Sequence, residues 1–108
     1  MSGLFEEYQL LALFDDYKII DPEVKIGEYS VTYDKKMTFI LYVSTYESTA
    51  ILTLINNDTN NIIFNIGIKK LEKIICKEEK LFFFKERSLQ QPILTIQIKP
   101  MISLDCDL

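Results

Sequence analysis

The sequence has 108 residues, which suits one domain, and 48% of them are hydrophobic, so the chain has ample material for a core. This hydrophobicity argues against wholesale disorder, and the formal net charge of −4 argues against non-specific binding to nucleic acid or to an anionic membrane. No apolar run approaches the roughly 20 residues that a membrane helix needs. The start of the chain also lacks the basic segment and the longer apolar run of a signal peptide. We therefore expect a single domain over residues 1–108, located in the cytoplasm.

Charge is distributed unevenly along the chain. Residues 1–34 contain eight acidic residues and two lysines, a formal charge of −6, whereas the remaining residues carry +2. Such asymmetry bears on partners and solubility rather than on the fold. We expect a protein partner steered by this first third of the chain to be basic.

The first predicted element is a helix over about residues 3–16. Ser2 is a suitable N-cap, and Glu6 and Glu7 suit the positive end of the helix dipole. Pro22 ends any helix before it, because the residue that precedes a proline favours extended geometry.

A β-rich body is predicted over about residues 24–100. Tyr29, Val31 and Tyr33 alternate with polar residues, which is typical of a half-buried strand. Three further runs, MTFILYVST, TAILTLI and IIFNIGI, are separated by short polar turns and are rich in residues that favour strands. The four runs predict an antiparallel meander. In the last run, the side chains expected on one face are Ile62, Phe64, Ile66 and Ile68.

The run KKLEKIICKEEKLFFFKE is ambiguous, because its apolar residues fit either a helix or two strands. As a helix it would place Glu78 within the apolar face, so we favour a hairpin that turns at KEEK, or a short helical turn followed by a strand. ILTIQIK, between Pro92 and Pro100, reads as the final strand before a short C-terminal tail. The predicted fold class is mainly β, with α+β at the margin. It is an antiparallel meander or small β-sandwich of about six to eight strands with one N-terminal helix.

The polar stretch INNDTNNI, residues 55–62, resembles a cation-binding loop at first sight. An EF-hand loop begun at Asn56 would place Asn61 where glycine is needed and Gly67 where a bidentate glutamate must lie. Asp58 is the single carboxylate available to such an ion. Asn and Asp favour turns because they tolerate left-handed backbone angles, so the stretch predicts a turn between strands. The formal glycosylation sequon that begins at Asn57 matters only in a secretory pathway.

Residues suited to catalysis or to binding a metal ion or cofactor are scarce. The chain has no histidine, which removes the commonest general base and metal ligand. Cys76 lies between Lys73 and Lys77, which could lower its pKa, but its apolar neighbours favour a small core residue. Adjacent acidic residues point in different directions on helices and strands, so the acid pairs do not form a two-carboxylate site. Two distant cysteines and three scattered glycines fit no zinc or nucleotide motif, so the sequence predicts a non-enzymatic protein with no metal or cofactor.

Nucleic-acid binding has weak support. Four lysines would share one helical sector if residues 69–80 were helical, but acidic residues flank them and the chain has a single arginine. A solvated surface accounts for these residues. The aromatic run of residues 82–84 suits alternate faces of a strand better than a base-stacking platform.

One feature favours protein binding. Runs such as FILYV and AILTLI are apolar on both faces, so they must be covered twice or must meet another molecule. We therefore predict a cytosolic protein–protein interaction module, in the class of small inhibitors, immunity proteins or phage-encoded modulators. The alternative is an assembly unit that forms a homo-oligomer through edge strands or an apolar sheet face. The predicted partner-binding residues are Glu6, Glu7, Asp15, Asp16, Phe82 and Phe84.

Overall fold

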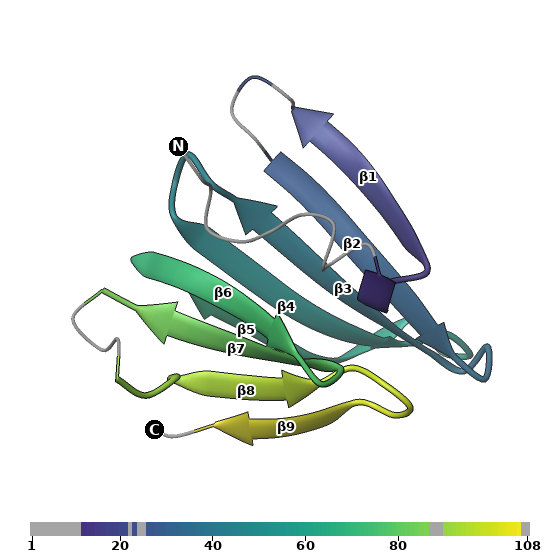
Figure 1. Ribbon diagram of the computed structural model, residues 1–108. Coiled ribbons are helices and arrows are strands. Elements are labelled where there is room, and N and C mark those ends of the chain that lie inside the picture. The colour runs from purple at the N-terminus through teal and green to yellow at the C-terminus, as the bar shows by residue number, and fades with distance from the viewer. Residues whose placement is uncertain (1–11, 22, 24–25, 87–89, 107–108) are drawn as a thin grey trace.

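The computed structural model describes residues 12–21, 23, 26–86 and 90–106, with the backbone alone for Asp21 and for residues 104–106. The described chain forms two antiparallel sheets, one of five strands in the order β1-β2-β3-β4-β5 and one of four in the order β6-β7-β8-β9 (Figure 1). The strands are β1 Asp16–Asp21, β2 Ile26–Tyr33, β3 Met37–Ser44, β4 Thr49–Asn56, β5 Asn61–Ile68, β6 Leu71–Lys77, β7 Lys80–Lys85, β8 Leu94–Gln97 and β9 Ser103–Cys106. No helix in this described part is long and apolar enough to cross a membrane.

The predicted meander is confirmed in β2 to β5, which pair in sequence order, and burial alternates along β2, β3 and β4 as the pleat of a strand requires. Phe39 and Leu41 of β3 are fully buried, and Tyr29 and Val31 of β2 are almost so. The cross-strand pairs Tyr29–Leu41 and Val31–Phe39 place these side chains on one face. That face is the side of the first sheet that lies against the core.

The ambiguous run forms the predicted hairpin, with β6 and β7 paired from Leu71–Lys85 to Lys77–Lys80. Glu78 and Glu79 make the turn, and both have positive φ, of 53° and 64°. Two positive φ angles are the requirement of a type I′ turn, whose twist matches that of the flanking strands. The helical alternative for residues 69–80 is therefore excluded.

INNDTNNI forms the predicted turn between β4 and β5. Asn60 has a φ of 59° and donates its backbone N–H to the carbonyl oxygen of Asn56 at 2.8 Å. Asn56 Oδ1 accepts the backbone N–H of Asp58 at 3.0 Å. Asn57 binds the neighbouring β2–β3 turn, since its backbone N–H donates to the Lys36 carbonyl oxygen at 2.8 Å. The amide-rich stretch thus links the β4–β5 turn to the β2–β3 turn by a hydrogen bond.

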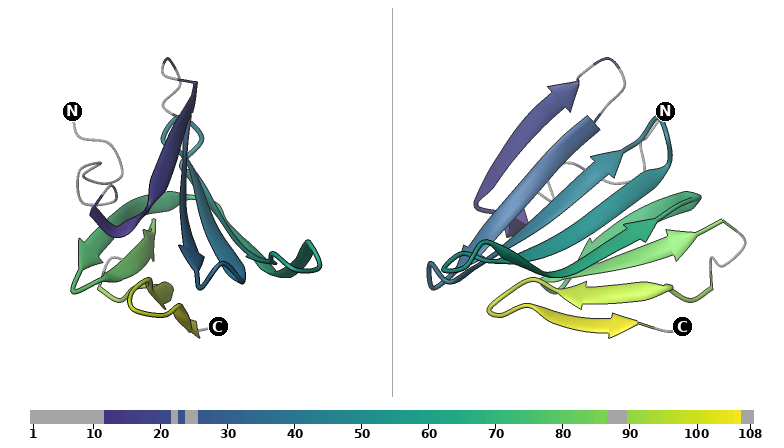
Figure 2. Two further views of the ribbon diagram at one scale, coloured as in Figure 1. Left: turned by 90° about the vertical axis from the view of Figure 1, so that its right-hand side faces the viewer. Right: turned by 180° about the vertical axis from the view of Figure 1, so that it is seen from behind.

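One core joins the two sheets. Beyond β5 the chain crosses to the second sheet at the Lys69–Lys70 corner, and the Leu71 N–H donates to the Ser48 carbonyl oxygen at 2.8 Å. Figures 1 and 2 show β1 at the edge of the first sheet opposite to β5, the strand from which the chain crosses to the second sheet. Residues of both sheets share a single buried cluster, which includes Phe39, Leu41, Leu52, Leu81, Phe83, Leu94 and Ile96. Phe14, which precedes β1, packs into the same cluster with its ring 6.0 Å from that of Phe39.

The two ends of the chain differ from the prediction. Of the helix predicted over 3–16, residues 1–11 lie outside the description, Ala12 and Leu13 are helical, and Asp16 already begins β1. Residues 14–16 are therefore not helical as predicted, because β2 offers residues 16–21 an antiparallel partner, and the rest of the predicted helix is not shown. Residues 103–106 are β9 rather than a tail, so the described part holds nine strands instead of six to eight.

A bulge changes the facing of Ile62. Leu54 lies opposite Phe64, whereas the next residue of β4, Ile55, lies opposite Ile62, so β5 holds one extra residue there. Phe64, Ile66 and Ile68 keep the inner face that was predicted. Ile62 does not, and it is exposed at 60%.

Candidate functional site

Two of the four predicted acidic residues, Asp15 and Asp16, lie at the start of β1. Glu6 and Glu7 lie outside the described residues. Asp15 donates its backbone N–H to the Ser30 carbonyl oxygen at 2.9 Å, and its Oδ2 accepts the backbone N–H of Thr32 at 3.3 Å. Asp16 is exposed, and its Oδ1 accepts the following backbone N–H at 2.9 Å. Asp15 therefore links the start of β1 to β2, and both carboxylates are exposed.

The predicted aromatic residues lie on the other sheet, in β7, so the structure does not bring the two groups together in one strand or sheet. Phe83 points into the core, and alternation directs Phe82 and Phe84 to the outer face. Phe84 is only 8% exposed, and the Lys73 Nζ lies 5.0 Å from the centre of its ring. Phe82 is half-buried opposite Ile75. Phe82 thus offers more surface to a partner than Phe84.

An open cavity of about 470 Å³ lies where the β2–β3 hairpin approaches the β8–β9 connection. It combines two acidic and two basic residues with apolar ones. The lining residues are Asp15, Val31, Thr32, Tyr33, Asp34, Lys36, Met37, Lys99, Pro100 and Met101. Acids and bases balance there, so the cavity has no net charge with which to select an anion or a cation.

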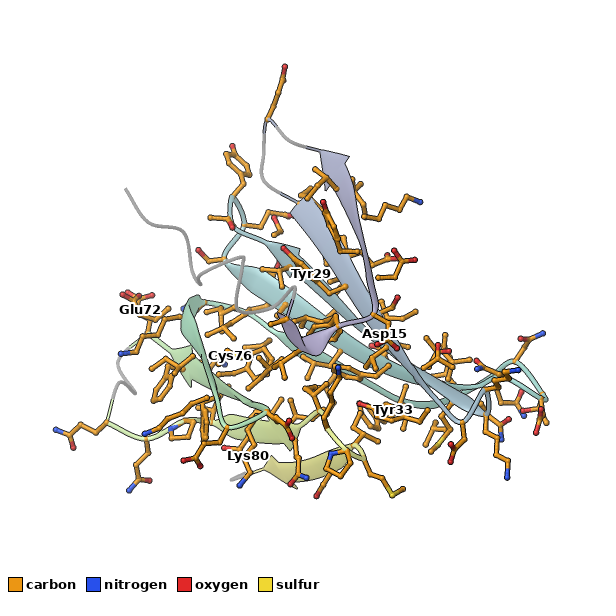
Figure 3. All side chains as sticks on the ribbon, turned by 45° about the vertical axis from the view of Figure 1, so that its right-hand side comes forward. Asp15, Tyr29, Tyr33, Glu72, Cys76 and Lys80 are labelled. Carbon is orange, nitrogen blue, oxygen red and sulfur yellow. The ribbon has the colours of Figure 1, made fainter. Side chains whose placement is uncertain are left out.

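Among the residues that line this cavity, Tyr33 has a pKa that is clearly shifted from its ordinary value. Burial, together with the nearby Asp15 charge, raises the pKa of Tyr33 to about 12. Its hydroxyl donates to the carbonyl oxygen of Ile98 and so links the two sheets. Figure 3 shows Asp15 and Tyr33 on the same side of the molecule. A phenol that stays protonated at neutral pH and is already hydrogen-bonded acts as a structural link rather than as a general base.

This pKa predicts alkaline destabilisation. Tyrosine in an unfolded chain titrates near 10, and because the folded-state pKa is about 12, the folded protein holds the proton more tightly. The resulting stability is complete below about pH 10 and is lost as the pH rises towards 12. We expect Tyr33→Phe to flatten the fall in unfolding free energy between pH 9 and pH 11.5, measured by urea denaturation. Tyr42→Phe, which alters the opposite face of the sheet, is the control, and an identical pH slope in all three proteins would contradict this assignment.

Cys76 lies on the inner side of β6, half-buried and packed against the core. Burial raises the pKa of its thiol. A raised pKa disfavours the thiolate, which is the nucleophilic form. The interpretation of Cys76 as a small core residue fits this environment.

The outer face of β3, β4 and β5 has an unusual composition. These three strands have eight residues each, and none of the residues is charged. Residues in register across the three strands share one face. The outward side chains form three rows, which are Tyr42–Ile51–Gly67, Ile40–Thr53–Asn65 and Thr38–Ile55–Ile62. We call these nine residues the uncharged face.

Three polar residues of the uncharged face, Thr38, Thr53 and Asn65, have hydrogen-bond partners within the protein. Asn65 Nδ2 donates to Thr53 Oγ1 at 3.0 Å, and the hydroxyl of Thr38 lies 3.1 Å from that of Thr32. Thr38 also donates to Asn57 Oδ1 at 3.0 Å. Because these groups are already paired within the sheet, a docking molecule loses less in desolvating them. Aliphatic side chains, Ile51 at 38% and Ile62 at 60% exposure, remain open beside them.

The residues of the uncharged face were not among the predicted site residues. The signal for them was the pair of runs FILYV and AILTLI, which are apolar on both faces. Among the described residues, the second sheet and the core contact the inner face only. The outward residues of those runs therefore form the second apolar surface that the sequence indicated without saying which face of the sheet would carry it.

The fold and this surface define a small, mainly β protein of two antiparallel sheets, in which three adjacent strands of the first sheet contain no charged residue. No family model matches the sequence, and comparison with curated proteins and with solved structures found no match either.

Proposed function

We infer that this protein is a non-enzymatic interaction module that binds another protein through the uncharged face. The observation that carries the proposal is the run of three adjacent eight-residue strands without a charged side chain. Solvent-exposed sheets normally alternate apolar residues inward with polar or charged residues outward. A sheet surface that lacks charge and exposes isoleucines is typical of an interface that is covered when a partner binds.

Charge elsewhere in the chain suits a supporting role in partner binding. The first 34 residues carry a formal charge of −6, and β1 and β2 bring part of it to the side of the sheet next to the uncharged face. Charged residues at the rim of an interface mainly raise the association rate, and salt weakens that effect. The proposed partner is therefore a protein with an apolar patch and basic residues beside it.

The test compares two lysine substitutions at matched positions. Ile51 lies in the uncharged face and Ile75 on the outer side of β6, and both are isoleucines in strands with 38% exposure. We expect Ile51→Lys to reduce capture of specific partners from a lysate of the native cells by at least about tenfold, because a lysine must be desolvated in the interface. Ile75→Lys should leave capture unchanged.

Both variants must unfold at nearly the parent denaturant concentration, which shows that binding rather than folding has changed. Capture at low and high salt should differ in amount but not in the identity of the partners. Equal capture by the parent, Ile51→Lys and Ile75→Lys proteins would contradict the assignment of the binding surface.

A further inference from the structure

The sheet edges of this protein are protected unequally. Edge strands expose unpaired backbone groups, and proteins commonly protect them with charged residues. Three of the four edge strands contain charged residues, which are Asp16, Lys18 and Asp21 in β1, Glu72, Lys73 and Lys77 in β6, and Asp105 in β9. The fourth edge strand, β5, has none in eight residues. Among the described residues β5 pairs with β4 alone, and five of its eight residues are exposed.

We propose that two copies of this chain pair through the free edge of β5, antiparallel and related by a two-fold axis. Two molecules that each carry a net charge of −4 repel one another, so self-association favours a contact without charge. The charges nearest to β5 also favour this arrangement. Asp58 lies in the turn before β5, whereas Lys69 and Lys70 follow its end. Antiparallel pairing places the Asp58 end of each copy near the Lys69–Lys70 corner of the other.

The two faces of β5 determine the register. Phe64 and Ile66 face the core side, whereas Asn65 and Gly67 lie on the uncharged face. A slip of one residue would set inward residues against outward ones. With Asn65 on the two-fold axis, Phe64 of each copy lies opposite Ile66 of the other, which is a favourable aromatic–aliphatic cross-strand pair.

Space beside Gly67 fits the same register. A Cβ atom added at Gly67 would meet no atom within 4 Å, so the surface there is open. Ile63, which is 50% exposed, comes opposite Gly67 of the second copy when Asn65 lies on the axis. Each copy then covers an exposed isoleucine of the other. Pairing uses the β5 edge of both molecules, so the contact closes at two copies.

This pairing would join two five-stranded sheets into one and set the two uncharged faces side by side. The inference deepens the proposed function, because it names a second copy of the chain as one protein partner. It uses the edge of β5 rather than the outward side chains of β3 and β4. Failure of the dimer therefore leaves the comparison of Ile51→Lys with Ile75→Lys intact as the test of the proposed function.

Sedimentation of the purified full-length chain is the first measurement. We expect a species of twice the 12.7 kDa chain mass at micromolar concentration, in equilibrium with monomer on dilution. Ile63→Lys should weaken dimerisation by at least about 100-fold, because both copies then carry a charge at the paired edge. Ile75→Lys should dimerise like the parent. A parent protein that is monomeric up to about 100 μM, or a dimer that Ile63→Lys does not weaken, would overturn the inference.

Two further variants test the direction and register of pairing. Asp58→Lys should weaken the dimer, and combining it with Lys69→Asp and Lys70→Asp should restore affinity, because the opposing charges are then exchanged. Asn65→Cys, in a background with Cys76 and Cys106 replaced by alanine, should form a disulfide-linked dimer on mild oxidation. Thr53→Cys, on the same face but in the central strand β4, should not. Absence of the cross-link in a dimeric Asn65→Cys protein would exclude this register.

Discussion

Phe39→Ala is expected to lower the free energy of unfolding by about 3–5 kcal/mol, as large aromatic truncations in protein cores do. Phe39 has no exposed surface, and its ring centre lies 6.0 Å from that of Phe14 and 6.4 Å from that of Phe64. It therefore joins the segment before β1, the middle of β3 and the edge strand β5. Removing the ring leaves a cavity among rigid strands, which relax only in part.

Urea denaturation followed by circular dichroism measures this loss. Ile40→Ala is the matched control, because Ile40 is the next residue of the same strand and points to the uncharged face. It should cost about 1 kcal/mol, since its side chain is only partly buried. Phe39→Leu, which keeps much of the apolar volume, should lie between the two and remains measurable if the alanine variant does not fold. Equal losses for Phe39→Ala and Ile40→Ala would contradict the assignment of the inner face.

Ile96→Ala is expected to destabilise both sheets together, by about 2–5 kcal/mol. Ile96 is fully buried in β8 of the second sheet and belongs to the cluster that also contains Phe39 and Leu41 of the first. The chain has no tryptophan, and all six tyrosines precede Glu47. Tyrosine fluorescence therefore reports on the first sheet and the segment before it, whereas circular dichroism reports on the strands of both sheets.

If the shared core makes one cooperative unit, Ile96→Ala shifts the tyrosine transition and the circular dichroism transition by the same amount. Thr95→Ala is the control, because Thr95 is adjacent in β8 and is not part of the buried cluster. A tyrosine transition that stays at the parent midpoint while the circular dichroism signal shifts would contradict the prediction of a single domain.

Period-two alternation predicted the strands that have one face in the core. β2 and β3 were predicted from residues such as Tyr29 and Phe39, which the structure buries. β1 was missed because the segment of residues 16–21 is short and follows a segment with helical periodicity. Its strand conformation depends on pairing with β2. β9 has four residues, too few for a periodic signal, and forms by pairing with β8.

The candidate site was predicted less well than the fold. Apolar residues on both faces of β3 and β4 indicated that one surface needs a partner, but local pattern cannot say which face the second sheet covers. The side of the sheet to which a residue of β5 points also depends on the bulge between β4 and β5, which turns Ile62 outward. No residue type in IIFNIGI predicts this bulge. Phe84 was predicted as a partner-binding residue, yet it is buried, whereas Asp15 is exposed and also contacts the β2 backbone.

The simple strand order has a consequence for folding speed. Every sheet ladder of the described chain joins strands that are consecutive in sequence. Each pairing therefore closes only a short loop, and single hairpins form in about 1–10 μs. Sandwiches with crossed connections must instead bring distant strands together first, which slows their search. This chain is expected to reach its native state sooner than most two-sheet proteins of its length, with docking of the two finished sheets as the slow step.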